Sequence, residues 1–409
     1  MDRVIERCAG FDIHRDSVAV CVRVPGPHGE RLQHVRTFGT TTAELLALRD
    51  WLRAEGVTHV AMESTGVYWK PVYYVLDEEC ECLLVNAAHL KHVPGRKTDV
   101  KDCVWIAQVL EHGLLRGSFV PPPLIRDLRD LTRYRRVLID ERTREANRLH
   151  KVLQDAGIKL ASVASDVLGV SGRAMLAALV EGTTDPAVLA DLARGKLRRK
   201  LPALRQALTD RFRPHHAFLA AQILAHLDYL EEALQTLTDR IGDLLAPFAV
   251  VIEHLDTIPG ISRQTAEEVV AEVGLDMSRF PTARHLSSWA GLCPGQNESA
   301  GKRRSSRIRK GNRWLRCSLV LAAQSVRYTK DTALAARYRR LARRRGDKKA
   351  IVAVAHMLLV IAYHVIRDDT TYHELGLDYY DHRAADHARR RALATLEQQG
   401  YRVTLERAA

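Results

Sequence analysis

Residues 10–24 read GFDIHRDSVAVCVRV. Valine occupies every second position from Val18 to Val24, which is the period of a half-buried β-strand. Glycine and proline at residues 26–29 mark a turn, and a second apolar run follows at residues 32–39. These residues therefore predict two strands joined as a hairpin.

The residues that follow alternate between helical and strand patterns. Leucines recur at helical spacing in residues 45–52, and residues 69–79 also predict a helix. Short strands are predicted at residues 58–62 and 82–86. Strands that alternate with helices after a hairpin favour a mixed α/β sheet. A run of three prolines at 121–123 ends this region.

Beyond the prolines the chain has mainly helical patterns. One long helix is predicted at residues 125–156, and a second begins after Pro214. The second has a heptad seam, with apolar residues at steps of four and three: Ile223, Leu227, Leu230, Leu234, Leu237, Ile241 and Leu244. The two helices could pack on each other within one chain, or the seam could form a coiled coil between chains. Periodicity does not distinguish the two.

These patterns predict four regions: an α/β domain at 1–120, a helical connector at 121–248, a mostly helical domain at 249–370 and a helical tail at 371–409. The connector is expected to be a long coiled coil.

Composition restricts the class of protein. The 409 residues include 62 Lys and Arg against 49 Asp and Glu, a net charge of +13, which favours polyanionic partners. Seven cysteines without zinc-ligand spacing predict reduced, mostly buried thiols. The N-terminus lacks a signal-peptide pattern, and the apolar run 351–366 is too short to span a bilayer. We expect a cytoplasmic protein without a membrane partner.

Four carboxylates are candidate metal ligands. Asp12 and Glu63 end short apolar runs, so they are expected at the ends of neighbouring strands. Asp99 and Asp102 are three residues apart after Thr98, which could cap a helix and place both acids on its first turn. Each acid alone is more often a solvated or capping group. Together they predict a site for Mg²⁺, which prefers oxygen ligands, with Mn²⁺ as a substitute. Asp16 is a weaker candidate.

A serine in a basic loop is the candidate nucleophile. Ser299 lies in the turn-rich segment 291–301, and eight of the fifteen residues from 302 to 316 are basic. These cations could hold a phosphate and stabilise developing charge. An ordinary solvated loop is the alternative. The basic residues are Lys302, Arg303, Arg304, Arg307, Arg309, Lys310, Arg313 and Arg316.

Further positions could bind nucleic acid. Arg129, Arg133 and Arg136 lie on the first long helix. Gly260 lies in a Pro-Gly connection before a helix, which is similar to the hairpin of helix-hairpin-helix modules that bind DNA phosphates. An ordinary helix connection is equally consistent with that pattern. A second basic cluster spans 337–349.

Several motifs together resemble a known family. GFDIHRDS, AMESTGVYW and KTDVKD, in this order, are similar to the acidic motifs of the DEDD insertion-sequence transposases. The stretch from PGIS through AGLCPGQNESAGKRRSSRIRKGNRWLR resembles their C-terminal domain, and NRLHKVL resembles their connector. Some relatives have Ser-Ser-Gly-Gly where this chain has residues 298–301, so Ser299 is the one serine of the motif and Glu298 has no assigned role.

The resemblance implies a ribonuclease-H/RuvC-like N-terminal domain in which Asp12, Glu63, Asp99 and Asp102 bind Mg²⁺. It implies that Ser299 forms a covalent phosphoserine link to DNA. It also implies a noncoding bridge RNA that pairs with target and donor DNA, and dimers that pair into a tetramer, with one protomer's acids acting beside another's serine. Such a protein would act in the cytoplasm, at the nucleoid.

Two other hypotheses share the same basic surface. The first is a metal-dependent nuclease or junction resolvase in which water attacks the phosphate and Ser299 only binds it. The second is a non-catalytic nucleic-acid-binding protein whose acids are structural. Salt-dependent binding alone cannot separate the three.

Overall fold

The computed structural model describes residues 3–64, 66–87, 90, 102–209, 211–295, 297–305 and 307–404, with the backbone only at 297–299, 303 and 304. The chain forms two compact units, residues 1–120 and 121–409. Each unit has its own hydrophobic core.

The first unit is a five-stranded sheet with the order β3-β2-β1-β4-β5. Its strands are β1 (Cys8–Ile13), β2 (Ser17–Pro25), β3 (Arg31–Gly39), β4 (His59–Glu63) and β5 (Glu81–Val85). The first three are antiparallel neighbours, whereas β4 and β5 run parallel to β1. The predicted mixed α/β sheet is therefore confirmed.

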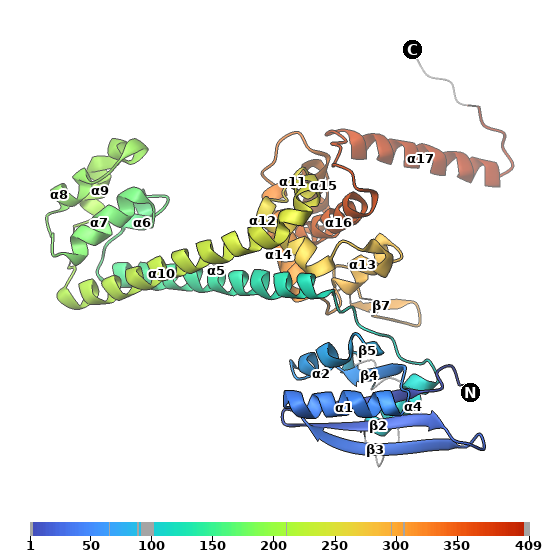
Figure 1. The fold of residues 1–409 in the computed structure, drawn as a ribbon. Helices are drawn as coiled ribbons and strands as arrows, with labels where there is room; N and C mark the ends of the chain where they lie inside the picture. The colour runs from blue at the N-terminus through green and yellow to red at the C-terminus, as the bar shows by residue number, and fades with distance from the viewer. Residues whose placement is uncertain are drawn as a thin grey trace. The chain divides into compact units, whose positions relative to one another are not determined.

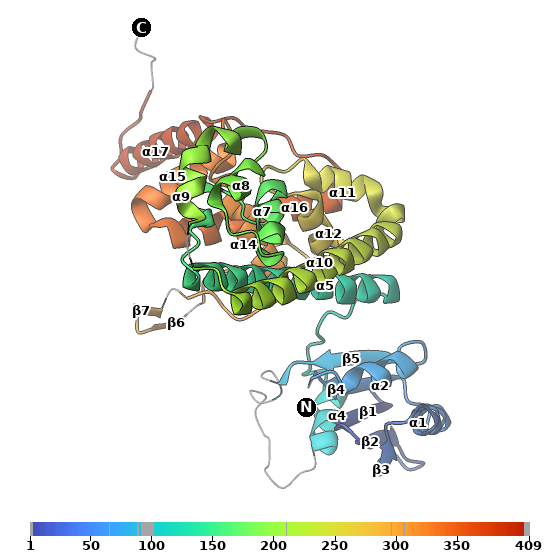
Figure 2. The same cartoon turned by 90° about the vertical axis from the view of Figure 1, so that its left-hand side faces the viewer.

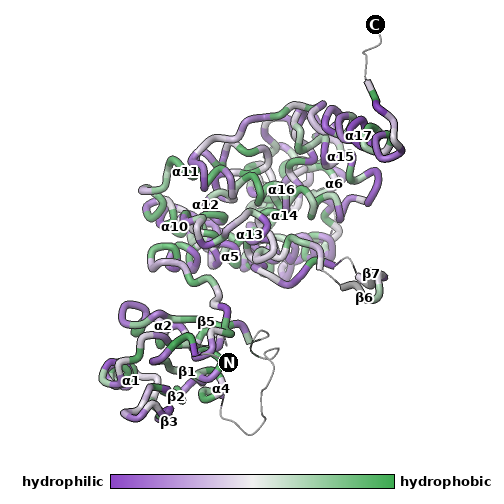
Figure 3. Tube along the Cα trace, turned by 90° about the vertical axis from the view of Figure 1, so that its right-hand side faces the viewer, coloured by the Kyte–Doolittle hydropathy of each residue, from purple (hydrophilic) through white to green (hydrophobic). Residues whose placement is uncertain are grey.

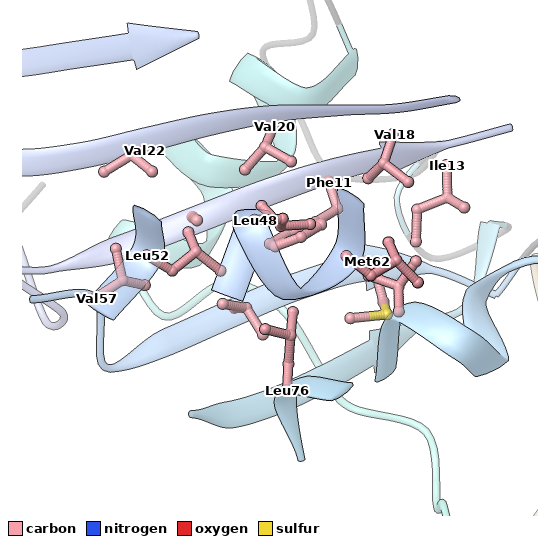
Figure 4. Packing of buried hydrophobic residues seen from close by; sticks show 14 of the residues in the cluster. Phe11, Ile13, Val18, Val20, Val22, Leu48, Leu52, Val57, Met62 and Leu76 are labelled. Carbon is pink, nitrogen blue, oxygen red and sulfur yellow. The ribbon is translucent and has the colours of Figure 1, made fainter. Parts of the chain in front are cut away.

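Helices cover both faces of this sheet. α1 (Thr42–Ala54) and α2 (Trp69–Leu76) pack on one face, and α4 (Asp102–Glu111) packs on the other. Figure 4 shows Phe11 and Val20 of the sheet against Leu48 of α1, with Met62 beside them. The alternating valines of β2 point into this core, as their spacing predicts.

Two long antiparallel helices begin the second unit. α5 (Pro123–Asp155) and α10 (Pro214–Leu245) lie side by side in Figure 1. Leu149 and Leu153, near the end of α5, share a core cluster with Ala220 and Leu227, near the start of α10. The helices therefore pack on each other within one chain, the first of the two predicted alternatives.

Short helices connect these long ones and form the distal end of the pair. They are α6 (Leu160–Val163), α7 (Val170–Val180), α8 (Pro186–Asp191), the 3-10 helix η1 (Gly195–Lys200) and α9 (Leu201–Ala207). Their core residues include Met175, Leu189 and Leu204, so they form a separate hydrophobic cluster with the ends of α5 and α10. The sequence prediction did not identify this cluster.

The remaining residues form a helical domain with a two-stranded hairpin. Its elements are η2 (Ala246–Phe248), α11 (Ala249–Asp256), α12 (Arg263–Val273), η3 (Met277–Arg279), α13 (Ala283–Trp289), β6 (Asn297–Ser299), β7 (Lys302–Ser305), α14 (Arg313–Val326), α15 (Ala333–Arg345), α16 (Asp347–Asp368) and α17 (Tyr379–Gln398). Figure 3 shows α14 and α16 as largely hydrophobic, whereas much of α17 is hydrophilic.

α16 is the apolar helix of this domain. Its 22 residues meet the length and composition of a membrane span, but half of the most apolar window is buried inside the protein. Val354, Leu358 and Ala362 are fully buried, and Tyr363 donates a hydrogen bond to the carbonyl of Phe280 at 2.9 Å. These contacts identify α16 as the core helix of a globular domain.

Candidate functional site

The two acids at strand ends lie on adjacent strands. Phe11 of β1 pairs with Met62 of β4 in parallel register, so the next residues, Asp12 and Glu63, lie side by side, at the last position but one of β1 and at the last position of β4. Phe11 and Met62 belong to the core beneath α1. Because side chains alternate along a strand, both acids project from the opposite face, which α4 covers. Both are half-buried.

The third acid is placed by the close packing of α4 on β1. A Cβ atom on Gly10 would lie 2.3 Å from the backbone nitrogen of Ala107 and from the carbonyl oxygen of Cys103, so only glycine allows this approach. The backbone of Val4 bonds to the carbonyl of Glu111, so α4 runs antiparallel to β1. Its first residue, Asp102, is therefore at the end of β1 that carries Asp12.

The opposite end of α4 is fixed by a buried ion-pair cluster. Glu111 is 1% exposed, and its carboxylate lies 2.6 Å from Nε of Arg23, 3.0 Å from Nε of Arg31 and 3.4 Å from Nε of Arg3. These arginines come from β2, β3 and the N-terminal segment. The cluster sets the position of α4 along the sheet, and no motif in the sequence signals it.

Asp12, Glu63 and Asp102 thus share one face and one end of the sheet. Three half-buried carboxylates offer the hard oxygen ligands that suit Mg²⁺. The imidazole Nε2 of His14 lies 3.4 Å from Oδ2 of Asp12. The predicted ligand Asp99 and its cap Thr98 lie outside the described residues. Asp16 is 84% exposed in the turn after β1 and pairs with Arg15 at 3.5 Å.

The candidate nucleophile lies at a hairpin tip. Ser299 of β6 pairs with Lys302 of β7, and the two residues between them have positive φ angles, 50° at Ala300 and 73° at Gly301. A two-residue turn with positive φ angles at both positions has the φ pattern of a type I′ hairpin turn. Ser299 is therefore the last strand residue before a tight two-residue turn. Figure 2 shows β6 and β7 at the periphery of the helices of this unit.

At the base of this hairpin the two chain segments approach closely at Gly291 and Gly311, a contact called the neck. A Cβ atom on Gly311 would lie 2.4 Å from the backbone nitrogen of Gly291, so the two glycines hold the chain segments together. The backbone N–H of Gly295 donates to the carbonyl of Arg307 at 2.7 Å, and that of Asn312 donates to the carbonyl of Trp289 at 3.2 Å. The segment between Gly291 and Gly311, which carries β6 and β7 and is called the Ser299 arm, therefore leaves and returns to the helical domain at one place.

Exposed cations lie along the second half of this arm and at the start of α14. The side chains of Lys302, Arg307, Arg309, Lys310 and Arg313 are exposed, and that of Arg316 is half-buried on α14. The Arg313 guanidinium also lies 4.5 Å from the ring centroid of Trp314. For the side chains that the structure describes, the basic run therefore offers phosphate-binding groups to solvent.

Two arginines of α5 use their guanidinium groups inside the protein. Arg133 donates from Nε and Nη2 to the two carboxylate oxygens of Glu272 at 2.7 and 2.8 Å. Arg129 donates to the carbonyls of Ala271 and Glu272, at the end of α12. Arg136 lies 3.3 Å from Asp140 on its own helix. Arg129 and Arg133 thus join α5 to α12 and engage their guanidinium groups with protein atoms.

The Pro-Gly segment connects two helices, α11 and α12, as its sequence suggests. Ser262 caps α12 by accepting from the backbone of Thr265 at 3.4 Å. Gly260 has a φ of 91°, and a Cβ atom there would lie 2.4 Å from the Val326 side chain. Its carbonyl accepts from Ser325 Oγ at 3.2 Å. Gly260 is therefore required for the turn and for packing on α14.

Asp155, His215 and His216 form a separate cluster with metal-ligand atoms within 4.8 Å of one another. However, Nδ1 of His216 accepts from the backbone N–H of Arg213 at 3.1 Å. Its proton is then on Nε2, which donates to Asp155 at 3.0 Å. Both ring nitrogens of His216 are used, so this residue caps α10 and has no free imidazole lone pair for a metal ion.

Comparisons with known proteins place both units in one family. A DEDD transposase model of the IS110 type matches residues 9–158, and a model described as "Transposase IS116/IS110/IS902 family" matches residues 252–339. The chain is 26% identical over 330 residues to an insertion element IS110 protein of Streptomyces coelicolor, covering 74% of this chain and 80% of that protein.

Two further relatives have more specific names. The transposase for insertion sequence element IS1111A of Coxiella burnetii is 28% identical over 299 residues, which cover 71% of this chain and 72% of that protein. The pilin gene-inverting protein of Moraxella bovis is 34% identical over 121 residues, which cover 29% of this chain and 37% of that protein. The two family models include the segments with the strand-end acids and the serine hairpin.

Proposed function

Because this chain belongs to the IS110 family of DEDD transposases and is a DNA transposase or recombinase, we propose that it cuts and rejoins DNA through Ser299. The observation that carries the proposal is the position of Ser299, beside a tight turn at the tip of a hairpin within an exposed cationic segment. A nucleophile in this position can enter a DNA groove or junction without moving the helical domain.

The first chemical step is a transesterification. The Oγ–P bond to Ser299 forms as one P–O bond of the DNA strand breaks. The serine proton passes to water, and the departing DNA oxygen gains a proton and becomes a hydroxyl. Rejoining is the reverse, in which a DNA hydroxyl attacks the phosphoserine and the serine regains its proton. The phosphodiester energy is conserved in the protein–DNA bond, so no nucleotide cofactor is needed.

The carboxylates and the cations have separate roles in this reaction. Asp12, Glu63 and Asp102, with Asp99, would hold Mg²⁺ or Mn²⁺, and the bound ion would supply stabilisation of the negative charge that develops in phosphoryl transfer. The exposed Arg307, Arg309 and Lys310, with the rest of the basic run, neutralise DNA phosphates. In this division the acids of the α/β sheet bind the metal ion, and the cations of the serine arm bind the DNA backbone.

A guide RNA would supply the sequence information. Contacts from lysine and arginine to phosphates position a protein on DNA but do not read bases. We therefore assign site choice to an element-encoded bridge RNA that pairs with target and donor DNA, as the family resemblance implies. The active form is a dimer that pairs into a tetramer, located in the cytoplasm at the nucleoid. The likeness to a gene-inverting protein supports site-specific recombination.

A covalent adduct tests this proposal. The purified protein, RNA transcribed from the element's noncoding end and labelled DNA with the element's ends are incubated with Mg²⁺ and analysed on a denaturing gel. Wild type and the Ser305→Ala variant, which changes a serine on the same hairpin, should form a protein–DNA adduct, and Ser299→Ala should not. Cleavage to free ends without an adduct would instead favour attack by water.

A further inference from the structure

Glu272 connects three parts of the second unit. It lies on α12 and is 2% exposed. Its carboxylate accepts two hydrogen bonds from Arg133 of α5 and one from Nδ2 of Asn312 at 2.6 Å. Nε of Arg129 lies 3.5 Å away. One buried carboxylate thus joins α5 and α12 to the residue that ends the Ser299 arm.

Asn312 bonds to the chain on both sides of the arm, at the start of α14 and at the end of α13. Its Oδ1 accepts from the backbone N–H groups of Trp314 and Leu315 at 3.0 and 3.2 Å and so caps α14. Its own N–H donates to the carbonyl of Trp289, at the other side of the neck. The adjacent Gly311 packs against Gly291. The Glu272–Asn312 bond therefore fixes the place where the arm leaves the helical domain.

We infer that Glu272 is a positioning residue that holds the neck of the Ser299 arm through Asn312. This inference rests on the proposed role of Ser299 for its catalytic consequence only. Burying a carboxylate has a desolvation cost, and apolar residues stabilise a helix interface equally well or better. A carboxylate has the advantage over an apolar residue that its hydrogen bonds fix a specific geometry. Here it accepts one bond from Asn312 and two parallel bonds from Arg133.

The chain offers a matched control one helical turn away. Glu268 is 7% exposed on the same helix, and its carboxylate accepts from Ser318 and Gln264 instead of from the arm. Glu268→Gln and Glu272→Gln therefore remove the same charge from similarly buried positions. Only the second change weakens the bond to Asn312.

The reciprocal variant separates positioning from general destabilisation. In Glu272→Gln/Asn312→Asp the amide and the carboxylate exchange places, so the bond between residues 272 and 312 can form again with donor and acceptor reversed. The introduced carboxylate can still cap α14, because aspartate is as good an N-cap as asparagine. The milder Asn312→Ser keeps a capping hydroxyl and removes only the Nδ2 donor to Glu272, so it is the second variant if Glu272→Gln folds poorly.

The experiment measures backbone hydrogen exchange of full-length protein at residues 292–312, together with the rate of adduct formation on the DNA defined above. In Glu272→Gln and Asn312→Ser, exchange in this segment should rise about tenfold, since a bond to a charged group is lost. Adduct formation should slow while DNA affinity is unchanged. The reciprocal variant should recover part of both properties, because the bond between residues 272 and 312 returns while Nη2 of Arg133 loses its acceptor. Glu268→Gln should match wild type in this segment.

Unchanged exchange at 292–312 in both Glu272→Gln and Asn312→Ser would overturn the inference, as would an equal rise in Glu268→Gln. A different result would contradict the proposed role of Ser299. If the arm loosens as expected but Ser299→Ala still forms the adduct, Glu272 anchors the arm and Ser299 is not the nucleophile.

Discussion

Gly10 of β1 lies so close to α4 that a Cβ atom there would be 2.3 Å from the backbone nitrogen of Ala107. Because Gly10 has no side chain, α4 packs closely on the sheet face that carries Asp12 and Glu63. Asp102 is the first described residue of α4, so the absence of a side chain at Gly10 lets the helix that carries the third acid approach the sheet face of the other two. The Glu111 cluster fixes the same helix at its other end.

Gly10→Ala should therefore weaken both stability and catalysis. The three close atoms all belong to the backbone of Ala107 and Cys103, so the helix must move, which costs about 1–3 kcal/mol for overpacking of this kind. Urea unfolding measures the loss, and adduct formation measures the effect on the acids. Gly117→Ala is the control, because the nearest atom to its added Cβ would be 3.8 Å away. Equal stability of the two variants would contradict the close packing.

Loss of a carboxylate at the metal-binding face should stop cleavage without preventing DNA binding. Asp12→Asn and Glu63→Gln should each slow adduct formation more than about a hundredfold, since even outer-shell partners of a metal ion contribute up to that factor. Chelation of Mg²⁺ should have the same effect in wild type. Asp16→Asn, at the exposed position in the adjacent turn, should be fully active. Normal cleavage by Asp12→Asn and Glu63→Gln would show that these acids are structural.

Substitutions at the two turn residues should change the stability of the hairpin in opposite directions. Ala300 has a φ of 50°, a left-handed conformation that costs a residue with a Cβ atom about 1–2 kcal/mol. Ala300→Gly should slow hydrogen exchange at residues 297–305, whereas Gly301→Ala should speed it because Gly301 has a φ of 73°. Space around Gly301 is open, so the effect is conformational. Identical exchange in both variants would exclude this turn geometry.

Thiol reactivity should separate buried from exposed cysteines. Burial raises the pKa of Cys8 to about 11 and, with a smaller contribution from Cys103, the pKa of Cys21 to about 12. A raised pKa keeps a thiol protonated, so at pH 8 these two should resist alkylation in the native protein. Cys317 is exposed and should react first. Mass spectrometry of peptides after brief iodoacetamide treatment measures this order, and early modification of Cys8 would contradict it.

The sequence predicted the strands and strand-end acids because their signals are local. Alternating valines specify β2, and an acid at the end of an apolar run specifies Asp12 or Glu63. The seam on α10 was predicted too, but Leu227 and Ile241 are buried in this chain whereas Leu234 is only half-buried. A heptad seam does not show which helix packs against it, so oligomer formation is still a prediction.

Contacts between distant residues explain what the sequence could not predict. Arg133 looks like a member of a basic helix face, yet its charge is neutralised by Glu272, 139 residues further along the chain. Gly10 looks like part of an acidic motif, yet its role is to allow the backbone of α4 to pack closely on β1. In both cases the physical cause is a tertiary contact, for which one sequence carries no local pattern.

The identity of the residue bonded to DNA tests the central claim most directly. The adduct formed with Mg²⁺ is isolated under denaturing conditions, digested with nuclease and protease, and the phosphorylated peptide is sequenced by mass spectrometry. We predict a single phosphoserine, at Ser299 in the tip of the β6–β7 hairpin. A phosphate on any other residue, or cleaved DNA with free ends and no modified peptide, would contradict the account.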